Sequence, residues 1–210
     1  MKRLLALVLA LCMITSSSIV ALALEPEEQV DVGQIMSEID TYLKNNPSFG
    51  TITKANESKT AYIPLSNGET ATITITNERV SPSTRGSVDW TDFESGDYVL
   101  TYSEDIPSIA KFTHTVDYTL TRNEGLYLSE IEFTDTDISV IPKQNVTINS
   151  QDAMITANDT YAAEAEAYFA VTTSVPSFLP NFNLYSYINM SNGGGSDEGI
   201  VVHVNSYYSF

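Results

Sequence analysis

The sequence predicts a mainly β protein, an antiparallel β-sandwich with one N-terminal amphipathic helix. Residues 112–121 alternate strictly between apolar and polar side chains, as a half-buried strand does. Further short alternating segments follow one another, separated by turn residues. Only residues 31–44 show helical spacing. A closed barrel is the alternative, but short strands of uneven length favour the sandwich.

The alternating segment 112–121 is the first arm of a predicted hairpin. One face carries the residues Phe112, His114, Val116, Tyr118 and Leu120, and the other carries threonines and Asp117. Residues 122–125 supply turn chemistry, and a second strand follows at 126–133. A break in alternation near 128–129 indicates a bulge. We expect this hairpin to lie in the middle of a sheet.

Residues 1–23 have the pattern of a secretory signal peptide. Lys2 and Arg3 precede an apolar run at 4–14, and Ala21 and Ala23 mark a cleavage site. The single cysteine, Cys12, lies inside this segment, so the mature chain is expected to be cysteine-free. We therefore predict a secreted, extracellular protein of bacterial origin that relies on its core and not on disulfides.

Residues 24–48 are predicted to form an acidic leader followed by the helix at 31–44. Asp31 can cap the helix start, and Pro47 follows its end. One helix face carries Val32, Ile35, Met36, Ile39 and Leu43. Such a short amphipathic helix needs a partner surface, and we expect it to lie on the sheet.

Residues 49–210 are predicted to form a single β-domain of about ten short strands. Strands are expected at 61–65 and 70–80, joined by Asn67-Gly68, and at 88–93, 98–102, 138–141 and 146–148. Segment 161–171 contains strong helix formers, but as a strand it places Glu164 and Glu166 on one face, and we prefer the strand. The last hairpin is expected from 184–190 and 200–208.

The formal net charge of −17 makes nucleic acid and anionic membrane surfaces poor partners. The same charge suits a freely diffusing product, a cationic partner or calcium, and solubility alone also explains it. No stretch beyond the signal peptide is long and apolar enough for a membrane span.

The sequence identifies no catalytic residue, cofactor or metal site. His114 lies on an apolar strand face, where a core histidine is the simplest reading, and no Gly-x-Ser-x-Gly elbow is present. Carboxylates cluster at Asp89, Asp92, Glu94 and Asp97, and again at Asp135 and Asp137. They could serve a glycosidase or hold calcium, but 27 acidic residues produce such neighbours by chance.

The candidate ligand-binding residues are Tyr185, Tyr187, His203 and Tyr207 in the last hairpin. If Ile188 pairs with Val202, these four side chains share the outward face, with Tyr187 opposite His203. Aromatic side chains in a row can stack on sugar rings or bury an anchor residue of a partner. Alternatively, another element covers them.

These observations favour a secreted, non-enzymatic binding or interaction module with a glycan or protein partner. One alternative is a secreted carboxylate-dependent hydrolase of glycosidase type, since distant strands can bring carboxylates together. Another is an acidic effector or immunity-type protein that binds a basic partner.

Overall fold

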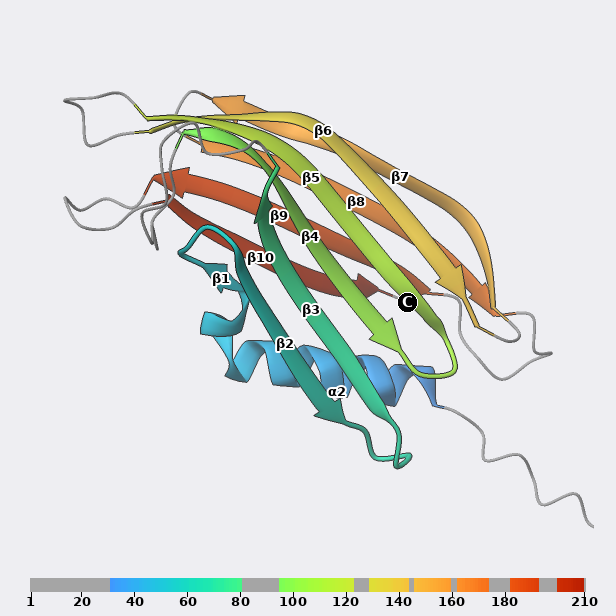
Figure 1. Cartoon of the computed structure of the whole chain (residues 1–210). Coiled ribbons are helices and arrows are strands. Elements are labelled where there is room, and N and C mark those ends of the chain that lie inside the picture. Colours follow the sequence, from blue (N-terminus) through green and yellow to red (C-terminus); the bar gives the residue numbers. More distant parts are fainter. Residues whose placement is uncertain are drawn as a thin grey trace, which may run out of the picture. The chain divides into compact units, whose positions relative to one another are not determined.

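Ten strands in two antiparallel five-stranded sheets make up most of the part of the chain that the structure describes (Figure 1). The structure is a computed structural model, and it describes residues 31–80, 95–122, 129–143, 146–159, 162–173, 182–192 and 200–209. Neither sheet closes on itself. The predicted antiparallel sandwich is therefore confirmed, and the barrel alternative is wrong.

The first sheet, here the meander sheet, has the order β2-β3-β4-β5-β6. Its strands are Glu57–Pro64, Thr70–Arg79, Gly96–Ile106, Ala110–Arg122 and Ser129–Pro142. The second, here the C-terminal sheet, has the order β1-β10-β9-β8-β7. Its strands are Thr51–Ile52, Ile200–Ser209, Phe182–Asn192, Ala162–Thr173 and Val146–Asp159.

Period-two alternation explains which side chains form the core. In β3, Ala71, Ile73 and Ile75 are buried, while the threonines between them face outward. The two inner faces meet through side-chain contacts, such as the 2.8 Å hydrogen bond between Tyr102 of β4 and Ser206 of β10. Each strand thus contributes one apolar row to the space between the sheets.

The helix α2 (Val32–Asn45) closes part of this core and is followed by the 3-10 turn η1 (Pro47–Gly50). The carboxylate of Asp31 accepts a hydrogen bond from the Gln34 N–H at 3.1 Å, which is the predicted N-cap. The buried helix residues are Val32, Ile35, Met36 and Ile39. Glu38 accepts from the Ser66 N–H at 3.0 Å, which ties α2 to the β2–β3 turn. The predicted helix and its apolar face are confirmed.

The predicted hairpin of residues 112–133 lies at one end of its sheet and not in the middle. β5 pairs with β6 as predicted, but β6 is the last strand of the meander sheet. The pairing contains one irregularity, where Thr134 is inserted opposite Asp117 and Tyr118. β6 also runs without a break through 138–141, which we had predicted as a separate strand.

Strand β7 was mostly missed by the sequence analysis, which predicted only 146–148 of Val146–Asp159. β7 is the end strand of the C-terminal sheet, and its pairing with β8 shifts register twice, between Ile148 and Ser150 and between Ile155 and Ala157. The strand assignment of segment 161–171 is confirmed by β8. The predicted signal peptide, acidic leader and strand 88–93 lie outside the described residues.

The last hairpin forms, but its register differs from the prediction by two residues. Val202 pairs with Met190 and Val204 with Ile188, so Tyr187 lies opposite Asn205. A slip of two residues keeps every side chain on its predicted face, because side chains alternate with period two. Leu184, Ile188 and Val202 are accordingly buried as expected.

The Gly50→Ala variant is expected to lose about 1–3 kcal/mol of unfolding free energy, measured by urea denaturation. A Cβ on Gly50 would press far inside van der Waals contact with the Val204 carbonyl oxygen, which is backbone and cannot turn away. Gly68→Ala is the matched control, because a Cβ there meets no atom within 4 Å and only the positive φ of +83° is strained. An equal or larger loss in Gly68→Ala would contradict this account of Gly50.

Candidate functional site

Three tyrosines stack on the outer face of β9 and β10. The ring centroids of Tyr185 and Tyr207 are 4.7 Å apart with planes 15° from parallel. Those of Tyr187 and Tyr207 are 5.5 Å apart at 11°. The hydroxyls of Tyr187 and Tyr207 are 3.0 Å apart, and Tyr207 is 44% exposed. The structure therefore brings together three of the four residues that the sequence predicted.

Strand geometry explains why the rings stack. Tyr185 and Tyr187 are two residues apart on β9, which separates them by about 6.8 Å along an antiparallel strand. That separation leaves room for one ring in van der Waals contact on both sides. Tyr207 of β10, which is the cross-strand partner of Tyr185, fills this space. The stack therefore uses ring faces internally and presents ring edges and hydroxyls to solvent.

The residues of β1, β9 and β10 around the stack are uncharged, whereas β8 places Glu166 opposite Tyr187 and Glu164 opposite Asn189. We call this surface the tyrosine face and define it as the outward residues Thr51, Asn183, Tyr185, Tyr187, Asn189, Ser191, His203, Asn205, Tyr207 and Ser209. None of these side chains carries a carboxylate, an ammonium or a guanidinium group, although the whole protein has a formal charge of −17. Their half-buried or exposed state shows that no described element buries this face.

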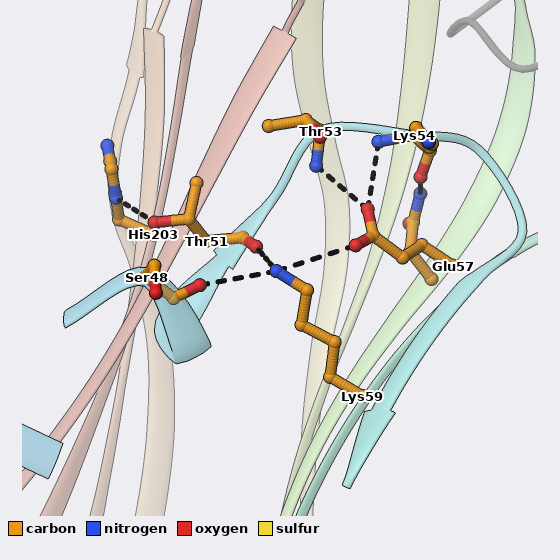
Figure 2. A network of polar contacts seen from close by, with 8 residues as sticks. Ser48, Thr51, Thr53, Lys54, Glu57, Lys59 and His203 are labelled. Carbon is orange, nitrogen blue, oxygen red and sulfur yellow. Dashed lines mark hydrogen bonds and ion pairs between the residues drawn. The ribbon is translucent and has the colours of Figure 1, made fainter. Parts of the chain in front are cut away.

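His203 lies on the tyrosine face but not against the stack. It pairs with Asn189 on β9 and with Thr51 on β1, and its Nδ1 is 3.3 Å from Thr51 Oγ1 (Figure 2). The prediction that His203 lies opposite Tyr187 is therefore wrong. His203 instead marks the β1 edge of the face.

This edge is held by a polar network that joins the two sheets (Figure 2). Lys59 of β2 donates to the carbonyl oxygens of Ser48, at 3.2 Å, and Thr51. Glu57 lies 3.4 Å from the Lys59 ammonium and accepts from the N–H groups of Thr53 and Lys54 at 3.0 and 3.1 Å. The network fixes β1 beside β10, and thereby the position of His203.

Glu104 is a buried carboxyl group that the sequence analysis missed. It is 0% exposed, and its Oε2 accepts from the Tyr102 hydroxyl at 3.0 Å. Burial is the main cause that raises the pKa of Glu104 to about 7. Its Oε1 has no hydrogen-bond partner among the described residues. No substrate can reach this carboxyl group while the sheets are packed.

A signal for Glu104 was present in the sequence. The alternation of Tyr98, Leu100 and Tyr102 continues to Ile106, and Glu104 occupies a position of the apolar row. A charged residue at such a position is either paired or neutral. The signal was overlooked because we ended the strand at Tyr102.

His114 is a core histidine, as its place on an apolar strand face indicated. It is 1% exposed, with Nδ1 3.1 Å from Ser186 Oγ and Nε2 3.0 Å from Thr136 Oγ1. Burial lowers the pKa of His114 to about 4, so the ring is neutral at pH 7. The Ser186–His114 pair has a serine next to a base, but both groups are closed to solvent and bridge the two sheets.

The candidate carboxylates that the structure describes are not assembled into a site. Asp135 and Asp137 are exposed on β6, and each accepts a hydrogen bond from the N–H of the residue that follows it. Asp89, Asp92 and Glu94 lie outside the described residues. Within the described ranges there is no group of three or more His, Cys, Asp or Glu residues placed to hold a metal ion.

None of the described helices is long and apolar enough to cross a membrane. No protein-family model, no curated protein and no solved structure matches this chain.

Proposed function

We propose that this protein is a secreted, non-enzymatic module that binds uncharged glycans through the tyrosine face. The observation that supports the proposal is the composition of this face, where asparagine amides and tyrosine hydroxyls surround an aromatic stack and no residue is a lysine or an arginine. The neighbouring strand β8 adds two acidic residues, Glu164 and Glu166, opposite Asn189 and Tyr187. The rest of the protein is strongly acidic.

A neutral glycan fits this chemistry. Amide and hydroxyl groups donate to and accept from sugar hydroxyls, and the exposed ring edges cover apolar C–H patches. An anionic polysaccharide would be repelled by the net charge of −17. A protein partner could also bury Tyr207, and a binding screen against glycans distinguishes the two kinds of partner.

The hydrolase alternative gains no support from the groups with the most perturbed acid–base properties. Glu104 and His114 have shifted pKa values, but both are buried between the sheets. A general acid or base must come within hydrogen-bond reach of its substrate. We therefore favour binding over catalysis.

The Tyr207→Ala variant is expected to weaken glycan binding about tenfold or more, because removing the central ring dismantles the stack. The measurement is a screen of neutral and anionic polysaccharides followed by calorimetric titration of the best neutral ligand. Tyr62→Ala is the matched control, since Tyr62 is 69% exposed on β2 of the other sheet.

Equal losses in Tyr207→Ala and Tyr62→Ala would contradict the assignment of binding to the tyrosine face. Binding to anionic polysaccharides alone would contradict the argument from charge. Failure of every glycan, together with a protein captured by the parent chain but not by Tyr207→Ala, would replace the glycan with a protein partner.

A further inference from the structure

We propose that Tyr187 and Tyr207 are a site of oxidative cross-linking, at which a one-electron oxidant joins the two rings as an intramolecular dityrosine. This inference concerns covalent modification of the folded protein. It does not depend on the proposed glycan-binding function.

The geometry of the pair favours this reaction. The two hydroxyl oxygens are 3.0 Å apart, and the rings are stacked at 5.5 Å and 11°. The Cε carbons are adjacent to the hydroxyl-bearing carbons, so nearly parallel rings with touching hydroxyls also bring their Cε atoms close. These are the carbons at which phenoxyl radicals couple.

The chemistry needs an oxidant, which we take to be hydrogen peroxide acting through a haem peroxidase. Each phenol loses one electron and one proton, and the resulting radicals form one Cε–Cε bond. The hydrogen on each coupled carbon then moves to the phenol oxygen, which restores both aromatic rings. Overall, two tyrosines and one peroxide give one dityrosine and two waters.

The contact between the two hydroxyls distinguishes this pair from Tyr185 and Tyr207, and accessibility distinguishes it from the buried tyrosines. Tyr207 is 44% exposed, so an oxidant can reach it. Tyr98 and Tyr118 also stack, with centroids 5.1 Å apart, but each is only 1% exposed. Tyr62 is 69% exposed, but no described aromatic ring stacks on it, so its radical would have to couple with another molecule.

The cross-link would take the place that a disulfide has in other exported proteins. The only cysteine of the sequence is Cys12, so residues 13–210 can form no disulfide. Tyr187 and Tyr207 are 20 positions apart and lie on adjacent strands, and a bond between them would tie β10 to β9.

The test is treatment of the dilute, folded full chain with a haem peroxidase and hydrogen peroxide. We expect a monomeric product that is lighter by two hydrogen atoms, shows dityrosine fluorescence and gives one peptide pair containing residues 187 and 207. Tyr187→Phe is expected to abolish this product, because phenylalanine forms no phenoxyl radical. Tyr185→Phe and Tyr62→Phe are the matched controls and are expected to retain it.

Three results would overturn the proposal. These are the absence of a cross-linked monomer from the folded parent chain, its persistence in Tyr187→Phe, or a bond mapped to another pair. The same treatment in guanidinium chloride controls for the fold. An equal yield of the same bond in the unfolded chain would show that the stacked geometry has no role.

Discussion

Replacing Glu104 by glutamine is expected to make the unfolding free energy rise with pH between about 4.5 and 6.5, whereas the parent protein should change little over this range. The native pKa of Glu104 is about 7, above the ordinary value of 4.5. Between these values the folded state keeps a proton that the unfolded state has lost. Glu104 alone therefore lowers the unfolding free energy as pH rises, by about 1.4 kcal/mol per unit and about 3 kcal/mol in total.

His114 has the opposite effect. Its native pKa is about 4, below the ordinary value of 6.5, so between these values the unfolded state binds a proton that the folded state does not. His114 alone therefore raises the unfolding free energy as pH rises, by a similar amount. The two slopes cancel in the parent protein, and Glu104→Gln leaves only the rising one.

The measurement is urea denaturation at half-unit pH steps from 4.5 to 7. Glutamine keeps the size of the side chain and an acceptor for the Tyr102 hydroxyl. Any remaining change in the unfolding free energy is the same at every pH and therefore does not affect the slope. The series stops at 4.5 because hydrogen bonds from Ser66 lower the pKa of Glu38, whose stabilising contribution is lost below that pH. A slope in Glu104→Gln equal to that of the parent would contradict the assignment.

Replacing His114 by asparagine is expected to give the reverse slope, with the unfolding free energy falling by about 3 kcal/mol between pH 4.5 and 7. Only the Glu104 contribution then remains over this range. Asparagine can keep the contact that Nδ1 makes with Ser186, and Thr136 still donates to the Thr115 carbonyl oxygen. The smaller side chain leaves a cavity, which is expected to cost about 2–3 kcal/mol at every pH.

Two measurements check this expectation. Urea denaturation gives the slope, and a positive slope in His114→Asn would contradict it. NMR titration of the parent protein gives the pKa of His114 directly, without a variant that has to fold. A value near 6.5 would show that the ring is not held neutral by burial.

Local patterns in the sequence were enough to identify the helix and most strands. The N-cap at Asp31 and the apolar spacing of α2 are set by residues three or four positions apart. β3 and β5 alternate because each has one buried face. β7 was missed because it is an end strand with two register shifts, where burial imposes little alternation.

Pairing partners could not be predicted with the same precision. Alternation assigned Tyr185, Tyr187, His203 and Tyr207 to one face, but it fixes the register only to within a multiple of two residues. The prediction that His203 lies opposite Tyr187 was wrong for this reason, and the stacking of Tyr207 became visible only in the structure. The Lys59 network joins different sheets and has no local pattern.

The pairing of β1 with β10 has a consequence for how the polypeptide reaches its native state. Thr51 and His203 are partners although about 150 positions separate them, so this ladder cannot form until nearly the entire chain is available. Contacts of such long range make folding slow. Slow folding keeps a newly made polypeptide unfolded for longer, and a protein with the proposed signal peptide must be unfolded to pass through a translocation channel.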